Sequence, residues 1–271
     1  MTHSKNPLGQ QTDYPNKYDP GLLFQIARSD SRESFISGEL PFDGCDIWNA
    51  WELTWLAQNG KPVVATAEIR VPASTPHLIE SKSLKLYLNA FAMSSFDSPA
   101  AVAATISEDL TACAGGSVRV RVDTVASTEA KLVSRLPGFC LDALEVSCTS
   151  RDVDAALLRI HPEILVSEEL HTHLLRSLCP VTSQPDIGSL AIHYKGAKID
   201  PESLLQYVVS FREHNDFHEA CIERMFVDLL EQCKPEKLTV FARYQRRGGI
   251  DINPFRSNFE ANPRNLRLWR Q

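Results

Sequence analysis

The sequence lacks several features that define common classes of protein. In its 271 residues, no hydrophobic run approaches the roughly 20 residues that a membrane-spanning helix needs. The first 20 residues are polar and contain no apolar segment of the secretory-signal type. We therefore expect a cytoplasmic protein without a membrane partner.

Positive charge is also in short supply. The chain has 28 Lys and Arg residues against 34 Asp and Glu residues, which gives a net charge of −6. A protein that neutralises a long nucleic-acid backbone usually carries the opposite sign. We therefore expect no direct nucleic-acid partner.

The seven cysteines form neither C-x-x-C pairs nor the Cys/His spacings typical of zinc sites. Their odd number and wide spacing indicate free thiols in a reducing compartment, most of them small core residues. Glycine-rich phosphate loops, G-x-S-x-G and H-E-x-x-H are also missing. We therefore predict no metal site, and any nucleotide cofactor must bind without the Rossmann glycine turn.

The sequence does contain enough apolar material for a folded core, because 43% of its residues are hydrophobic. The length allows one large domain or two domains of about 130 residues each. Residues 1–45 are rich in Asp, Ser, Pro and Asn, with one apolar island at 22–24. We expect this segment to be a lead-in that packs on the body of the protein.

From residue 46 onward, periodicity predicts one order of elements that occurs twice. Helices are indicated from near Glu80, from Ser98-Pro99 to Gly115, from Asp200-Pro201, and from near Asn215. Alternation predicts strands over 47–55, 63–71, 118–122, 144–148, 190–194, 238–244 and 250–252, with an Asn59-Gly60 hairpin turn after the first of these. We expect the segment 178–182 to pair with the strand near Leu190.

These elements predict an α+β fold built from two ββααββ units, with antiparallel sheets that carry a helix pair on one face. We expect the first unit at 46–155 and the second at 156–271, joined across about 125–175.

One stretch combines a cysteine with an aspartate in a stiff setting. Residues 179–186 read Cys-Pro-Val-Thr-Ser-Gln-Pro-Asp, and the two prolines favour a shaped loop over a helix. Such a loop can hold a thiol nucleophile, Cys179, beside a proton donor, Asp186. A buried structural thiol near a turn is the alternative.

Two further motifs combine charge with a helix start. His218-Glu219 opens a predicted helix, where Glu219 either complements the helix dipole or accepts two N–H donors from a guanine-like ring. Residues 80–87 (ESKSLKLY) carry two hydroxyls and two lysines at a helix start, which is either a solvated face or an anion site. Four arginines near the C-terminus, Arg243, Arg246, Arg247 and Arg256, form either a solvated rim or a phosphate clamp.

The stretch 80–87 resembles the signature of the NADPH-dependent 7-cyano-7-deazaguanine reductases, the nitrile reductases of queuosine biosynthesis. Cys179, Asp186 and His218-Glu219 follow in the order and approximate spacing of the long, two-module branch of that family. The lead-in at 18–24 and the segment 247–254 also resemble this branch. The resemblance covers most of the chain.

The resemblance implies two tandem tunnelling-fold modules and a homodimer. It also implies NADPH-dependent, metal-free reduction of the nitrile to 7-aminomethyl-7-deazaguanine, through a covalent thioimide on Cys179. Two NADPH are used per nitrile. The residues that it assigns are Cys179, Asp186 and His218 for catalysis; Glu80, Ser81, Lys82, His218 and Glu219 for substrate binding; and Lys82, Ser83, Arg247 and Gly248 for NADPH binding.

Two other functions remain open from the sequence. A GTP cyclohydrolase of the same superfold would also grip a purine-like ring through a carboxylate, but its zinc-dependent form needs a Cys/His cluster that the sequence does not reveal. A non-catalytic purine-binding protein of the same fold would bind the ligand without consuming NADPH.

Overall fold

The computed structural model describes residues 15, 17–124, 133–150 and 152–271. The chain divides into two compact units, each assembled from separated segments. Unit 1 comprises Met1–Asp30, Asp46–Lys131 and Arg246–Asp251, and unit 2 comprises Ser31–Cys45, Leu132–Gln245 and Ile252–Gln271. Parts of the expected lead-in (1–14 and 16) and of the expected junction (125–132 and 151) lie outside the described residues. The contiguous modules 46–155 and 156–271 remain a prediction.

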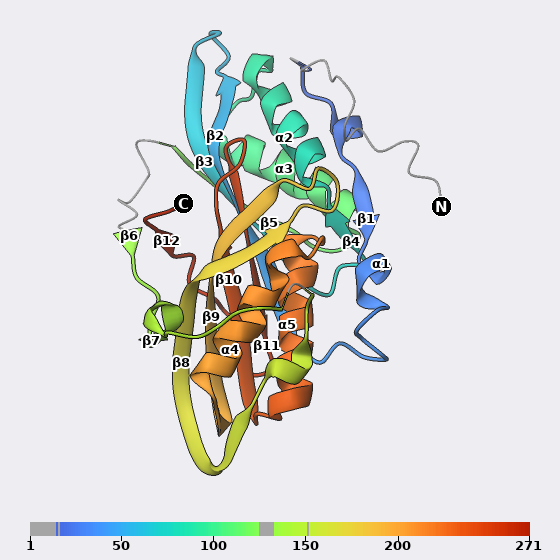
Figure 1. The fold of residues 1–271 in the computed structure, drawn as a ribbon. Helices are drawn as coiled ribbons and strands as arrows, with labels where there is room; N and C mark the ends of the chain where they lie inside the picture. The colour runs from blue at the N-terminus through green and yellow to red at the C-terminus, as the bar shows by residue number, and fades with distance from the viewer. Residues whose placement is uncertain (1–14, 16, 125–132, 151) are drawn as a thin grey trace. The chain divides into compact units, whose positions relative to one another are not determined.

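Unit 1 contains a sheet in the order β5-β3-β2, formed by Arg119–Thr124, Pro62–Pro72 and Asp43–Leu56. Helices α2 (Ser81–Asn89) and α3 (Pro99–Ala114) lie side by side next to these strands (Figure 1), and Tyr87 on α2 donates to Asp109 on α3. The short strand β1 (Gln25–Ala27) pairs antiparallel with β4 (His77–Ile79), so the chain before residue 28 is bound to the strand that leads into α2.

Unit 2 contains the strand order β11-β10-β9-β8-β7. Its strands are β7 (Phe139–Cys140), β8 (Ile160–Leu178), β9 (Pro185–Ile199), β10 (Lys237–Tyr244) and β11 (Ile250–Ser257), of which β7 alone is parallel to its neighbour. Helices α4 (Pro201–Ser210) and α5 (His218–Cys233) cover one face of these strands (Figure 1). The apolar side chains of β9 that face the helices, Leu190, Ile192 and Tyr194, are buried.

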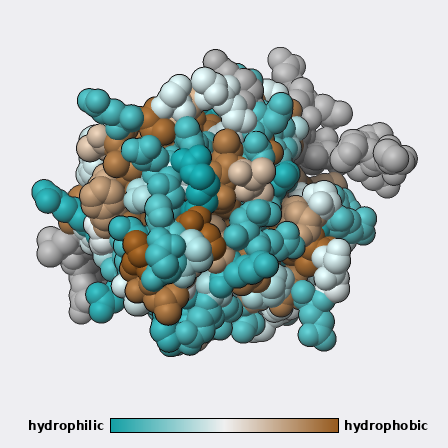
Figure 2. Space-filling model, turned by 60° about the horizontal axis from the view of Figure 1, so that its bottom comes forward, coloured by the Kyte–Doolittle hydropathy of each residue, from teal (hydrophilic) through white to brown (hydrophobic). Residues whose placement is uncertain are grey.

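Short elements complete the described chain: α1 (Ser29–Arg32), β6 (Val133–Ser134), β12 (Arg267–Leu268), which pairs with β6, and 3-10 turns at Pro20–Leu22, Ala90–Met93, Leu141–Ala143, Ala155–Leu157 and Phe211–Glu213. None of the helices in the described ranges is long and apolar enough to cross a membrane. On the face that Figure 2 shows, hydrophobic residues are scattered among hydrophilic ones. The helices and the mainly antiparallel sheets of the two units confirm the predicted α+β class.

The predicted starts of α3 and α4 agree with the structure because each is fixed by a local side-chain cap, whereas α5, predicted from near Asn215, begins at His218 without one. Asp200 accepts from the backbone N–H of Ser203 at the start of α4, and Ser98 accepts from that of Ala101 at the start of α3. Gly115 ends α3 with φ +74°, in the left-handed conformation that glycine favours.

Two predictions about strands are wrong. Residues 144–148 alternate in exposure but form no ladder, so they are an extended segment. The partner of the strand near Leu190 is the long β8, whereas 179–184 form the turn after it. The Asn59-Gly60 hairpin turn is confirmed, because it connects β2 and β3, which are neighbours in the sheet. Within this turn, Gly60 has a positive φ (+79°) and its N–H donates to the carbonyl of Ala57.

Candidate active site

In unit 2, Cys179 is the first residue after β8 and begins the tight turn that leads into β9. Its backbone N–H donates to the carbonyl of Gln184 (3.0 Å), and its carbonyl accepts from Ser183 (2.9 Å). Ser183 has a positive φ of +53°, which is uncommon for a residue other than glycine. The turn is thus closed by its own backbone, as the two prolines predict, and it holds a half-buried Cys179 at its first position.

Asp186 lies on the other side of this turn, as the second residue of β9. It is opposite Ser177 in the β8–β9 ladder and is 3% exposed. Its Oδ2 lies 3.3 Å from Nε2 of His218, the first residue of α5. The structure therefore brings together the aspartate and the histidine that the sequence singled out separately, next to the turn that carries Cys179.

The imidazole of His218 packs against the ring of Tyr244, with 4.0 Å between the ring centroids. Tyr244 is fully buried at the end of β10, and burial raises the pKa of its phenol well above the ordinary value. The phenol therefore stays neutral beside the imidazole. Sequence reasoning assigned Tyr244 only to a strand, because nothing in the local pattern shows that β10 places it against the start of α5.

Glu219 follows His218 in the first turn of α5 and is 3% exposed. A carboxylate at this end of a helix is stabilised by the helix dipole. The segment that precedes α5 is bound to the end of β8, because the backbone N–H of Leu178 donates to the carbonyl of His214 and the carbonyl of Leu178 accepts from the N–H of Asp216. Backbone hydrogen bonds thus connect the strand before Cys179 with the segment before His218 and Glu219.

In unit 1, Glu80 forms the start of α2. Its carboxylate accepts from the backbone N–H groups of Lys82 (2.9 Å) and Ser83 (2.7 Å), and the side chain is 2% exposed. The segment before β1 fixes the same turn, because Phe24 accepts from the backbone N–H of Glu80 (2.8 Å) and donates to the Ser83 hydroxyl (3.0 Å).

Ser83 is fully buried, and its hydroxyl also donates to the carbonyl of Glu80 (2.7 Å). Both hydrogen bonds of this hydroxyl serve the fold of the helix start. The contact of Ser83 with NADPH remains a prediction.

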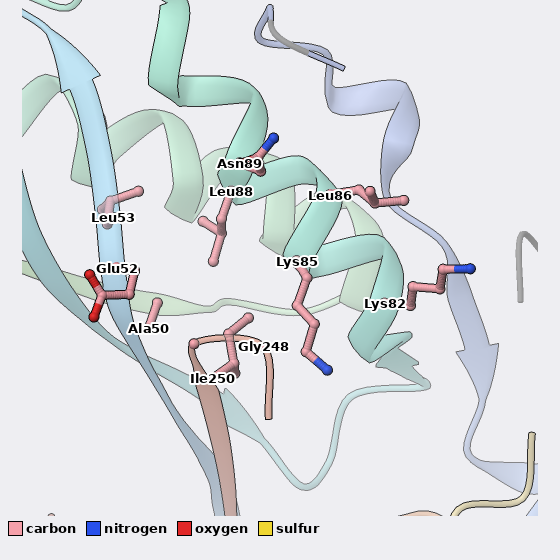
Figure 3. Close-up of a pocket in the computed structure, with 11 residues that line it drawn as sticks. Ala50, Glu52, Leu53, Lys82, Lys85, Leu86, Leu88, Asn89, Gly248 and Ile250 are labelled. Carbon is pink, nitrogen blue, oxygen red and sulfur yellow. The ribbon is translucent and has the colours of Figure 1, made fainter. Parts of the chain in front are cut away.

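A pocket of about 400 Å³ lies beside α2 in the same unit. Figure 3 shows Lys85 extending from α2 toward Gly248 and Ile250, while Lys82, which also lines the pocket, extends to another side of the helix. Two lysines and a glycine turn are suited to an anionic group, because the cations attract it and the glycine lets backbone approach it closely. The resemblance assigned Lys82 and Gly248 to NADPH binding, and both line this pocket together with Lys85.

The turn that carries Gly248 has a defined geometry. Arg247 and Ile250 exchange backbone hydrogen bonds (2.9 and 3.2 Å) around Gly248 and Gly249, whose φ angles are +59° and +81°. Positive φ at both central positions is the type I′ geometry that matches the twist of a hairpin. A second contact steadies this turn, because the guanidinium of Arg246 stacks over Trp51 at 4.6 Å.

Comparison with known proteins adds a family to this geometry. The family described as "Nitrile reductase, 7-cyano-7-deazaguanine-reductase N-term" matches residues 14–122, and the family described as "QueF-like protein" matches residues 185–263. A protein of Burkholderia thailandensis named NADPH-dependent 7-cyano-7-deazaguanine reductase is 50% identical over 274 aligned positions, which cover all of both chains. A solved structure of an archaeosine synthase QueF-like protein in the apo form is 18% identical, covers 36% of this chain and 96% of its own, and gives a TM-score of 0.32, too low to support a conclusion about the fold. With half of its residues identical to a reductase of the same length, the chain belongs to the NADPH-dependent 7-cyano-7-deazaguanine reductase family.

Proposed function

We propose that this protein reduces the nitrile of 7-cyano-7-deazaguanine to the primary amine 7-aminomethyl-7-deazaguanine, with two NADPH per nitrile, in queuosine biosynthesis. The observation that carries the proposal is the full-length, 50% identical relative with that name. The arrangement around Cys179 also supports it, because the turn that begins with Cys179 leads directly to the buried Asp186, whose partner is His218, and a thiol with a nearby proton donor suits addition to an electrophilic carbon.

The first step is addition of the Cys179 thiol across the carbon–nitrogen triple bond. The sulfur bonds to carbon as its S–H bond breaks, and Asp186 gives a proton to nitrogen and takes up the proton that the thiol releases, which gives a covalent thioimide. His218, 3.3 Å from Asp186, orients this carboxyl group and connects it to a route for replacing the proton. Tyr244 packs against His218 and fixes the plane of the imidazole.

The thioimide then accepts a hydride on carbon and a proton on nitrogen. The C–S bond of the resulting thiohemiaminal breaks, the Cys179 thiolate leaves and takes up a proton, and the protonated imine accepts a second hydride to become the amine. NADPH supplies both hydrides when it is bound, so the balance is four electrons and two NADPH. The covalent bond keeps the substrate from leaving before the first reduction.

Substrate recognition is assigned to both units. In unit 2, the buried carboxylate of Glu219 suits two N–H donors on the edge of a guanine-like ring, with His218 as a further partner. In unit 1, Ser81 and Lys82 are presented by the helix start that Glu80 stabilises. Glu80 thus contributes by positioning these two residues.

For NADPH, the pocket beside α2 is a fitting place for a phosphate-bearing part of the molecule. Lys82 and Lys85 supply positive charge there, and the turn of Arg247 and Gly248 supplies close-approaching backbone. Ser83 contributes through the helix start, because its hydroxyl is bonded to Glu80 and Phe24.

The proposal includes the tandem tunnelling-fold arrangement, a homodimer and a reducing cytoplasm. The reducing compartment is proposed from the chemistry, since Cys179 reacts as a thiol. Sedimentation of the purified protein tests the homodimer, which predicts twice the mass of one chain.

The function is tested by incubating the protein with 7-cyano-7-deazaguanine and NADPH. We expect two NADPH oxidised per amine formed, and, without NADPH, a substrate adduct on the intact protein that is present in the Cys148→Ser control and missing in Cys179→Ala. Binding without NADPH oxidation would instead indicate a non-catalytic purine-binding protein. Turnover of GTP would indicate a cyclohydrolase.

A further inference from the structure

A cluster of possible metal ligands lies in unit 2. Sγ of Cys140 and one ring nitrogen of each of His171 and His173 all lie within 4.8 Å of one another. The strand pattern explains why. His171 and His173 are two positions apart on β8, so they project from the same face, and Cys140 on β7 is in parallel register with His171.

This face of β8 is the one away from the helices. In the β8–β9 ladder, His171 is opposite Ala191, whereas its neighbour Thr172 is opposite the buried Leu190 that packs under the helices. The β8–β9 ladder is irregular after Thr172. Beyond this irregularity, Ser177 and its ladder partner Asp186 lie on the face that the helices cover, and Ser177 neighbours Cys221 of α5. The cluster is therefore separate from the Asp186–His218 pair.

The two histidines are already oriented by other groups. Nδ1 of His171 lies 2.8 Å from the carbonyl oxygen of Pro137, and Nδ1 of His173 lies 2.8 Å from Oγ of Ser189. When Nδ1 of His171 carries the hydrogen, it donates to the carbonyl of Pro137, and the lone pair of Nε2 is then available to bind a metal ion. Such a partner on the second ring nitrogen is what metal-bound histidines have in proteins.

The backbone around the cluster is also held in place. Asp142 accepts from the Thr172 hydroxyl (2.6 Å) and from the backbone N–H of His173 (3.0 Å). Gly138 has φ +81° and passes so close to β8 that a Cβ built on it would lie 1.9 Å from the carbonyl oxygen of Glu169. Only glycine allows this approach, which brings Cys140 beside His171.

We propose that Cys140, His171 and His173 bind one Zn²⁺ ion, with a water molecule in the fourth position. One thiolate and two imidazoles are ligands that zinc prefers, and tetrahedral coordination places them about 3.3–3.5 Å apart. In the structure the three ligand atoms lie within 4.8 Å of one another, so binding draws them closer together. Pro137, the partner of His171, also lines a pocket of about 890 Å³ in the same unit.

The bound ion links β7 to β8. Its effect is therefore on the stability of unit 2, and the reduction of the nitrile does not use it. The sequence pattern did not reveal this cluster because Cys140 is far from the two histidines along the chain and meets them only through parallel strand pairing.

Cobalt substitution of the full-length, metal-free protein tests the proposal. We expect a cobalt–thiolate charge-transfer band that saturates at one Co²⁺ per chain and is displaced by Zn²⁺. The band is lost in Cys140→Ser and reduced in His171→Gln. It persists in Cys148→Ser, Cys179→Ala and His161→Ala, whose side chains lie outside the cluster; His161 is an exposed histidine of the same strand.

Two measurements on the unaltered protein make the test independent of any folding defect in the variants. Zn²⁺ at a hundredfold excess over its Kd should raise Tm by about 5 °C, reversibly with a chelator. Zn²⁺ should also protect Cys140 from alkylation while Cys148 reacts at an unchanged rate. An unchanged Tm with equal alkylation of Cys140, or a cobalt band that disappears only in Cys179→Ala, would overturn the proposal.

Discussion

Nε2 of His218 lies 3.3 Å from Oδ2 of Asp186, so the first residue of α5 meets the second residue of β9. The aspartate is 3% exposed, while the side chain of His218 keeps 16% of its surface accessible. The pair therefore has a buried end and an end that reaches solvent. This arrangement suits a group that gives a proton to a bound substrate and then recovers one from water.

Replacing Asp186 by Asn removes the proton donor and keeps the shape of the side chain. We expect kcat for nitrile reduction to fall by about 10²–10⁴-fold, the usual contribution of a general acid. Tm should change little, because the amide still accepts from His218. Steady-state rates and thermal unfolding of the variant check this. Equal losses of activity and of Tm would show instead that Asp186 has a structural role.

Glu80 and Asp200 are matched helix-start carboxylates in the two units. Each accepts from the backbone N–H three residues on, at 2.7 Å from Ser83 and 2.8 Å from Ser203. We expect Glu80→Gln and Asp200→Asn each to cost about 0.3–1 kcal/mol of unfolding free energy, because the amide still accepts the backbone hydrogen bond but loses the attraction of the carboxylate to the positive helix end. Only Glu80→Gln should also raise KM for the nitrile, because only α2 presents Ser81 and Lys82. An identical KM in the two variants would contradict that role for α2.

Gly248→Ala tests the cofactor assignment of the glycine turn. Alanine at φ +59° costs about 1–2 kcal/mol, and its Cβ would lie 3.1 Å from Cδ of Lys85. We expect a lower Tm and a raised KM for NADPH, because Lys85 must move.

Gly60→Ala is the control for backbone strain alone. Its φ is +79°, and nothing lies within 4 Å of the added Cβ. It should lower Tm to a similar extent and leave KM for NADPH unchanged. A raised KM in both variants would mean that loss of stability, not the pocket, causes the effect.

How much of this could be predicted from the sequence depends on the range of the interactions. The start of α4 at Asp200 and the end of α3 at Gly115 are set by neighbours within a few residues, so residue type was enough. The strand β8 was missed because the ladder is irregular between His161 and Leu165 and between Thr172 and Leu175, which breaks the period of two.

For the candidate site, the resemblance identified residues that the local pattern could not connect. The turn at 179–184 follows from its prolines, but the meeting of His218 with Asp186 depends on how α5 packs on β9. The contact of Tyr244 with His218 and the position of Lys85 opposite Gly248 depend on tertiary packing in the same way. Such contacts leave no signal in a single sequence.

Two cysteines outside the site predict how stability depends on pH. Burial raises the pKa of Cys113 to about 11 and that of Cys233 to about 12, from an ordinary value of 9.0. Above pH 9 the unfolded chain loses these protons while the folded chain keeps them. The stabilisation is therefore complete below pH 9 and is lost as the pH rises through 11 and 12.

Thermal unfolding between pH 8 and 11 measures this loss. We expect Tm to decline above pH 9, and the decline to be shallower in Cys113→Ala, because that variant has one fewer proton to release on unfolding. Cys148→Ala is the control, since Cys148 is exposed and should leave the slope unchanged. Both variants lose one sulfur atom relative to the unaltered protein. A general destabilisation at alkaline pH therefore affects both equally and cancels when their Tm curves are compared. Parallel Tm curves for both would show that the Cys113 thiol does not contribute to the pH dependence.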